Sequence, residues 1–127
     1  MTARADALLG VVGLGAFRDH PATSLPMGAQ KLVELSRALM ARPLLLLLDE
    51  PAAGLNDAET AELAALLLAL RDGGITILLV EHNMPLVMAV ADRVIVLDLG
   101  RVIAAGAPQD IQCDPAVRAA YLGPEAR

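Results

Sequence analysis

The stretch LLLLLDEP, from Leu44 to Pro51, constrains the fold more than any other part of the sequence. A continuous leucine run bounded by Pro43 and Pro51 is typical of a strand that is covered on both faces of a sheet, although leucine is not a strong strand former. The run ends on two adjacent acids, Asp49 and Glu50. The sequence therefore predicts a buried strand that delivers two carboxylates to one end of a sheet.

A second strand is predicted from Ile75 to Val80, after a helix from Asp57 to Arg71 that Asn56 or Asp57 can cap. A strand, a helix and a strand joined by short links predict a right-handed crossover and a parallel pair. The segments that follow the two strands, Asp49-Glu50 and Glu81-His82, should then lie side by side. This is the edge at which open α/β sheets bind ligands.

The geometry of the two acids needs a further step, because neighbours on a regular strand point to opposite faces. Glu50 must leave the ladder to lie beside Asp49. Pro51 is expected to assist by confining Glu50 to extended conformations.

The remaining elements are predicted to be shorter. They are helices over 3–12 and 24–41, a helix that opens at Met84-Pro85, strands over 93–97 and 102–104 joined by a turn at Leu99-Gly100, and helices over 107–112 and 115–122. Together these elements predict an α/β fold with a mainly parallel sheet flanked by helices.

Composition excludes several classes of protein. The chain has 127 residues, enough for one domain with a core, and 56% of them are hydrophobic, which suggests apolar surface for a partner. Charges interrupt the sequence too often for a membrane-spanning helix, and the N-terminus does not resemble a secretory signal, so a cytoplasmic location is expected. A formal net charge of −5 argues against nucleic acid as a partner. One cysteine and two histidines provide no zinc ligand set, so oxygen ligands would hold any metal.

Three segments carry candidate chemistry. Nucleotide hydrolases hold Mg²⁺ with an Asp at the end of an apolar strand and orient the attacking water with an acid, the roles expected here for Asp49 and Glu50. His82 can donate a hydrogen bond to a terminal phosphate, and the free N–H groups of a helix beginning near Gly28 can bind another. The alternatives are a solvated acidic turn, a histidine that caps the next helix, and an ordinary amphipathic helix.

Together the three segments resemble the C-terminal half of the nucleotide-binding domain of ATP-binding-cassette (ABC) transporters. LPMGAQ is similar to the signature motif, LLLLLDE to the Walker B strand, AAGLN to the D-loop and VEH to the switch-histidine segment. The segments EHNMPLVMAVADRVIVLDLGRVIAAGAP and DPAVRAAYLG most resemble the ATP-binding subunits of branched-chain amino-acid importers.

The resemblance implies a function and a set of site residues. Glu50 and His82 would be catalytic, Asp49 would serve Mg²⁺, and ATP would lie between two such domains. The signature residues that would contact ATP of the opposite subunit are Pro26, Met27, Gly28, Ala29 and Gln30, and the D-loop residues are Gly54, Leu55 and Asn56. The implied partners are a second ATP-binding subunit and transmembrane permease subunits, with the chain on the inner face of the plasma membrane.

The resemblance also implies a division of the chain into three parts. Residues 1–42 would be the end of a helical subdomain that contains the signature helix, residues 43–106 the Walker B, D-loop and switch-histidine core, and residues 107–127 the C-terminal helices.

Some residues depart from the family pattern. Pro26 replaces the usual signature serine, and Asn56 replaces the commoner D-loop aspartate, as in many branched-chain subunits. The sequence contains no Gly-x-x-x-x-Gly-Lys-Ser/Thr, and its one lysine, Lys31, lies in the signature helix. The chain is therefore interpreted as a partial domain without the P-loop strand, inactive alone. A P-loop-less binding module that completes the ATP site of a partner subunit and a generic α/β domain are the alternative hypotheses.

Overall fold

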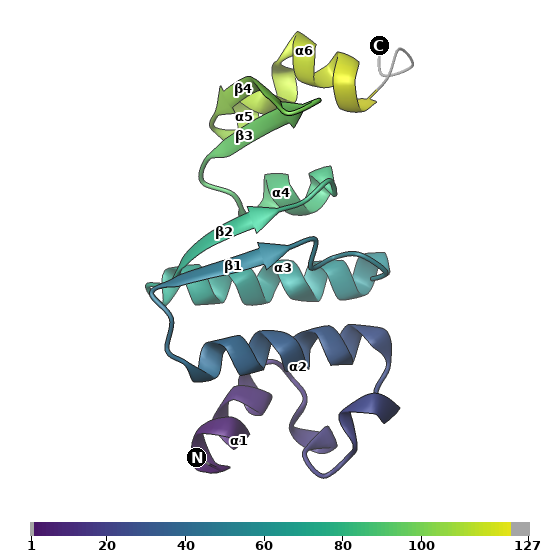
Figure 1. Ribbon diagram of the computed structural model, residues 1–127, viewed down its shortest axis with the longest axis vertical. Helices are drawn as coiled ribbons and strands as arrows, with labels where there is room; N and C mark the ends of the chain where they lie inside the picture. The colour runs from purple at the N-terminus through teal and green to yellow at the C-terminus, as the bar shows by residue number, and fades with distance from the viewer. Residues whose placement is uncertain (1, 123–127) are drawn as a thin grey trace. The chain divides into compact units, whose positions relative to one another are not determined.

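The computed structural model describes residues 2–122, and the chain divides into two compact units, Met1–His82 and Asn83–Arg127. The boundary lies just after the second strand of the first unit. The three-part division that the family resemblance implies remains a prediction. Each unit is described by itself (Figure 1).

Two helices form the N-terminal part of the first unit. Helix α1 spans Thr2–Val11 and helix α2 spans Met27–Met40, and the connection contains 3₁₀ turns at Gly15–Phe17 and Ala22–Ser24. The guanidinium of Arg4 on α1 donates to the carbonyl oxygens of Leu39 (2.8 Å) and Met40 (3.2 Å), which are among the last carbonyls of α2. This contact fastens α1 to the C-terminal end of α2.

Helix α2 begins later than the residue pattern suggests. The predicted range of 24–41 begins at Ser24, whereas α2 begins at Met27. Leu25 is extended, with ψ 150°, because the following proline disfavours helical geometry in the residue before it. Pro26 is itself the N-cap, with φ −56° and ψ 155°.

The predicted parallel strand pair is confirmed. Strand β1 (Leu45–Asp49) pairs in parallel with strand β2 (Thr76–Val80), and Leu45 lies opposite Thr76 and Asp49 opposite Val80. Helix α3, Asp57–Asp72, is the crossover between the strands (Figure 1). The α/β class with a parallel sheet and flanking helices is therefore confirmed.

The core of the first unit lies on one face of this pair. Leu46 is only 3% exposed and packs with Leu35 and Leu39 of α2. Partly buried side chains of α1, α3, the two strands and the residue just before β2 surround them: Leu8, Leu48, Leu66, Leu70, Ile75 and Ile77. The opposite face is open, since Leu45 and Leu47 are 51% and 65% exposed. The prediction of a strand covered on both faces is therefore wrong for the described residues: the helices that share this core pack on the Leu46 face alone.

The second unit consists of a hairpin and short helices. Helix α4 spans Met84–Val90, strands β3 and β4 span Val94–Asp98 and Arg101–Gly106, and helices α5 and α6 span Pro108–Cys113 and Pro115–Val117. A π-helical turn over Arg118–Leu122 follows. The core contains Val94, Val96, Ile111 and Val117.

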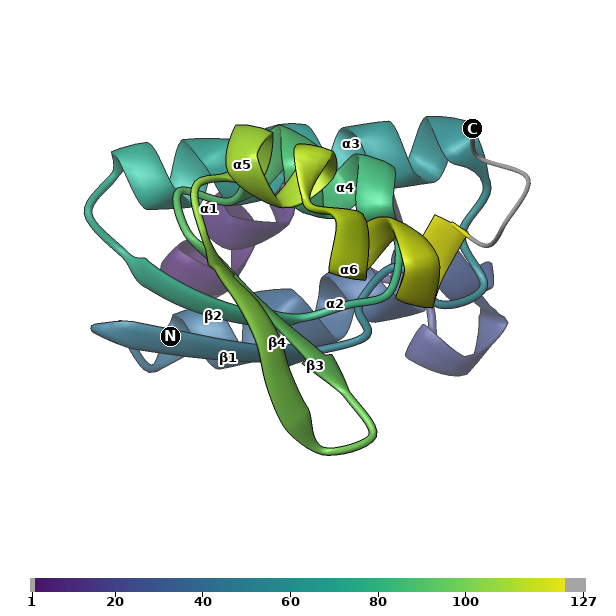
Figure 2. The same ribbon diagram turned by 90° about the horizontal axis from the view of Figure 1, so that it is seen from above.

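The strands β3 and β4 are antiparallel and form the long hairpin of Figure 2. Its tight turn is Leu99-Gly100, as predicted, with φ 46° and 76°. Positive φ at both central residues is the geometry of a type I′ turn, whose twist suits a two-residue hairpin. Across the described residues 2–122, no helix is long and apolar enough to span a membrane.

Candidate functional site

The ends of the parallel strands bring the predicted segments together. Asp49 is the last residue of β1 and lies opposite Val80, and the next backbone N–H, that of Glu50, donates to the carbonyl oxygen of Val80 at 2.8 Å. The prediction that the Asp49-Glu50 and Glu81-His82 segments share one edge is therefore confirmed.

Glu50 adopts an unusual backbone conformation. Its φ is 46°, in the left-handed region that residues other than glycine seldom occupy. The prediction of an extended Glu50 is therefore wrong. The carbonyl of this residue accepts the N–H of Ala53 at 3.1 Å, so the chain turns sharply directly after the strand. This turn carries the Glu50 side chain out of the strand ladder.

The Glu50 carboxylate lies beside His82. Its Oε1 is 3.3 Å from Nδ1 of the imidazole, and the two side chains are 52% and 68% exposed. The pair is accessible to a ligand and to water. The alternative role for His82 was to cap the next helix. Asn83 provides that cap instead, since its Oδ1 accepts the N–H of Leu86 at 3.0 Å.

Two side chains that the sequence analysis did not assign to the site hold the turn. Glu81 accepts the N–H of Ala52 through Oε1 at 2.8 Å and the N–H of His82 through Oε2 at 3.2 Å. From α2, Nζ of Lys31 donates to the carbonyls of Pro51 (3.3 Å) and Glu50 (3.5 Å). An acid next to the histidine was the only sequence signal for Glu81, and no local pattern indicated Lys31.

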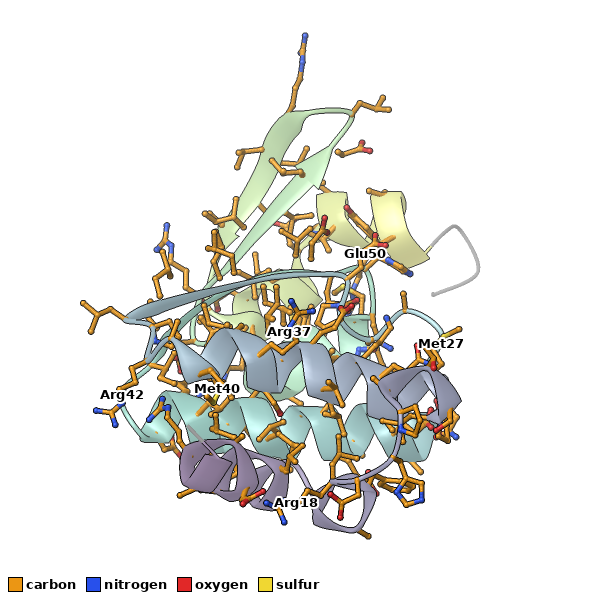
Figure 3. The ribbon with its side chains drawn as sticks, turned by 60° about the horizontal axis from the view of Figure 1, so that its bottom comes forward. Arg18, Met27, Arg37, Met40, Arg42 and Glu50 are labelled. Carbon is orange, nitrogen blue, oxygen red and sulfur yellow. The ribbon has the colours of Figure 1, made fainter. Side chains whose placement is uncertain are left out.

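Figure 3 places Glu50 on the side of Met27, the N-terminal end of α2, with Met40 at the opposite end of the helix. The N–H of Gln30 is bonded to the carbonyl of Pro26 at 3.0 Å, so the N–H groups of Met27, Gly28 and Ala29 precede the intrahelical bonds. Nε2 of Gln30 donates to the carbonyl of Leu25 at 2.9 Å.

The signature and D-loop segments contact each other within this chain. A Cβ at Gly28 would lie 2.8 Å from Oε1 of Glu59, and one at Gly54 would lie 2.6 Å from Sδ of Met27. A larger residue at Gly28 would therefore require the Glu59 carboxylate to move. At Gly54 the backbone conformation also favours glycine, since its φ is 79°.

Asn56 caps the helix that follows. Its Oδ1 accepts the N–H of Glu59 at 2.8 Å, and Oε2 of Glu59 accepts the N–H of Asn56 at 3.0 Å, which together form a capping box at the start of α3. Of the two predicted caps, Asn56 and Asp57, the first is therefore used. Leu55, just before the cap, is half-buried.

Carboxylates at this edge fit a hard cation better than a soft one. Among residues 2–122, no group of three or more His, Cys, Asp or Glu side chains could hold a metal by itself. Asp49 is exposed at the strand end. Mg²⁺ is commonly held by one or two protein carboxylates, with phosphate oxygens and water completing its shell. Asp49 and its surroundings fit that mode, with the ligand supplying the remaining oxygens.

A cavity of about 900 Å³ adjoins the site in the first unit. Residues of α2, β1 and α3 line it, and they are largely apolar apart from Asp49, Glu50 and a few charged side chains. The cavity therefore joins the carboxylates of Asp49 and Glu50 to apolar side chains of α2 and α3.

Comparisons with known proteins agree with the motifs. The family model described as "ABC transporter" matches residues 1–53, and the model "Branched-chain amino acid ATP-binding cassette transporter" matches residues 101–124. The high-affinity branched-chain amino acid transport ATP-binding protein BraF of Pseudomonas aeruginosa is 45% identical over 113 residues, covering 88% of this chain and 44% of BraF. LivG of Escherichia coli is 44% identical over 121 residues, covering 94% of this chain and 48% of LivG.

A solved structure shares the fold. The ADP conformation of MJ1267, an ATP-binding cassette of an ABC transporter, superposes with a TM-score of 0.86 at 33% identity and covers 95% of this chain and 49% of that one. The chain thus spans about half the length of the relatives that it matches. On the motifs, the family models and the fold, the chain belongs to the family of ABC transporter ATP-binding domains and is homologous to the branched-chain amino acid subunits LivG and BraF.

Proposed function

We propose that this chain is part of the ATP-hydrolysing subunit of an ABC importer for branched-chain or related hydrophobic amino acids. The observation that carries the proposal is the approach of Glu50 Oε1 to His82 Nδ1, 3.3 Å apart at the shared edge of two parallel strands. The names of BraF and LivG, which are branched-chain amino acid transport proteins, support the substrate class.

In this proposal each residue has a specific role. Mg·ATP supplies, when bound, the γ-phosphoryl group and the cation that neutralises its charge. Asp49 holds the cation through its carboxylate. Glu50 orients the attacking water and accepts its proton at the carboxylate. Because Nδ1 of His82 lies toward Glu50, a protonated imidazole can donate from Nδ1 to Glu50 and from Nε2 to the γ-phosphate.

The signature residues serve a nucleotide held by a second subunit. The first-turn N–H groups of α2, at Met27, Gly28 and Ala29, provide donors and the positive end of the helix dipole. Pro26, Met27 and Gln30 are exposed. The D-loop residues Gly54, Leu55 and Asn56 lie next to them and face the same partner. The proposed assembly is a dimer of ATP-binding subunits with permease subunits on the cytoplasmic face of the plasma membrane.

A chimera tests the proposal. This chain replaces the segment of E. coli LivG that aligns with it, and the rest of LivG supplies the upstream P-loop that the family resemblance implies. We expect ATP hydrolysis by the purified chimera and leucine uptake in cells that lack LivG. Glu50→Gln should lower kcat by about 10² or more, the size of a general-base contribution. Asp19→Asn, at an exposed acid outside the cavity, is the matched control.

A second candidate is a non-catalytic binding module. Lys31, the one lysine of the described residues, donates to the carbonyls of Glu50 and Pro51, so it is not placed to hold a phosphate of a nucleotide bound by this chain. Such a module would complete the ATP site of a partner subunit through its signature helix. The same chimera separates the two: turnover that is unchanged by Glu50→Gln and reduced by Gly28→Glu would support the binding module and refute the catalytic role of Glu50.

A further inference from the structure

The turn after β1 needs support from outside itself. Glu50 has φ 46° and precedes Pro51, and a left-handed non-glycine residue is costly unless its surroundings maintain it. The next N–H after the proline belongs to Ala52, which is only 7% exposed. A buried N–H group must find an acceptor. The nearby turn carbonyl, that of Glu50, already accepts the N–H of Ala53.

Glu81 provides the acceptor for Ala52. Its Oε1 is 2.8 Å from the Ala52 nitrogen, a distance typical of a strong bond to a charged acceptor. The other oxygen of the same carboxylate, Oε2, is 3.2 Å from the backbone nitrogen of His82. One partly buried carboxylate therefore connects the backbone after Glu50 with the backbone of His82.

We infer that Glu81 is a positioning residue, which fixes the distance between Glu50 and His82 by holding both backbone segments with one side chain. The inference rests on the proposed function of that pair. Glu81 itself does not touch the reacting atoms. The length of the Glu81 side chain matters, because its two oxygens must reach the turn and the strand end at the same time. Ala52, at the turn, is 29 residues from Glu81 in the sequence.

The geometric part of the inference is tested by NMR on the labelled full chain, without any assay of activity. Glu81→Gln leaves one acceptor oxygen for two N–H groups, and Glu81→Asp keeps the charge but shortens the side chain by one methylene. We expect both variants to speed amide exchange of Ala52 by about tenfold or more and to weaken the NOE between Glu50 and His82. Asp19→Asn, at an exposed acid outside the cavity, should change neither signal.

The functional part is tested in the LivG chimera. Displacement of Glu50 from His82 should lower kcat for ATP hydrolysis by roughly ten- to a hundredfold and leave KM for ATP within about twofold. A smaller folded fraction would also lower apparent kcat without changing KM, so each rate is divided by the folded fraction measured by circular dichroism. Glu81→Asp provides the same comparison if Glu81→Gln does not fold.

The outcomes separate the two proposals. Normal Ala52 exchange and a normal Glu50–His82 NOE in both folded variants would overturn the positioning role, whatever the chimera does. Unchanged kcat in the variants of an active chimera would also overturn it. An inactive wild-type chimera would refute the proposed function and, with it, a catalytic purpose for Glu81. The NMR result would still show whether Glu81 fixes the distance between Glu50 and His82.

Discussion

The capping box at the start of α3 allows a stability prediction from two measured contacts. Oδ1 of Asn56 accepts the Glu59 N–H at 2.8 Å, and Oε2 of Glu59 accepts the Asn56 N–H at 3.0 Å. Asn56→Ala removes the first bond and leaves the Glu59 N–H without its acceptor. Asn56 is exposed, so its truncation makes no cavity and the change in stability reports the cap itself.

The expected magnitude follows from caps of this type. Replacing an Asn cap by Ala costs ~1 kcal/mol, within a range of about 0.5–2. For a domain of this size the loss corresponds to a fall in Tm of roughly 3–6 °C. Asn56→Asp keeps an acceptor in the same place and adds a negative charge at the positive end of the helix, so its unfolding free energy should stay within about 0.5 kcal/mol of wild type.

The assay is urea unfolding of the full chain, followed by far-UV circular dichroism. Asn56→Ala should lower the midpoint and leave the m-value unchanged. The double variant with Glu59→Ala should lose less than the sum of the single losses, because both substitutions remove the same box. Equal midpoints for Asn56→Ala and wild type, or equal losses for Asn56→Ala and Asn56→Asp, would refute the reasoning.

Three further predictions concern packing. Leu67→Ala, at a side chain that is 1% exposed, should cost roughly 2–5 kcal/mol in urea unfolding, and Leu68→Ala, half-buried on the same helix, should cost less. Gly54→Ala should lower the free energy of unfolding by ~1 kcal/mol or more, because φ is 79° and Met27 Sδ would lie 2.6 Å from the added Cβ. Adding Met27→Ala should recover the steric part of this loss but not the part due to the backbone conformation. Leu47→Lys, on the open sheet face, should raise the concentration at which the chain self-associates in sedimentation velocity, and an unchanged threshold would show that this face does not drive association.

The parallel pair and its functional edge could be predicted because their signals are local. An apolar run between two prolines, a capped helix and a β-branched run are each readable within a few residues, and the handedness rule supplies the pairing. The predicted strand over 44–48 and the observed β1 over Leu45–Asp49 differ by one residue.

The turn that shapes the site could not be predicted in the same way. Neighbouring residues favour an extended Glu50, and the observed φ of 46° depends on contacts far along the chain. The carbonyl of Val80 accepts the N–H of Glu50, and Lys31 donates to the carbonyl of Glu50. The carboxylate of Glu81 accepts the N–H of Ala52. These partners are distant in sequence, so their combined effect is a property of the tertiary structure.

The exposed face of β1 shows a second limit. Five consecutive leucines predict burial on both faces, since sequence periodicity cannot show which neighbours are present. Within the described residues the Leu46 side is covered and the Leu45 and Leu47 side is open. What a strand can bury depends on the elements packed around it as well as on its own side chains.

The contact of Lys31 with the turn has a chemical consequence. Lys31 carries the only side-chain primary amine of the chain, and that amine donates to the carbonyls of Glu50 and Pro51. A reagent that acylates lysine side chains therefore has a single side-chain target, whose nucleophilicity is reduced while the amine is held by the carbonyls. The rate of acylation at Lys31, measured by mass spectrometry of one peptide, therefore reports how often the amine leaves these two carbonyls.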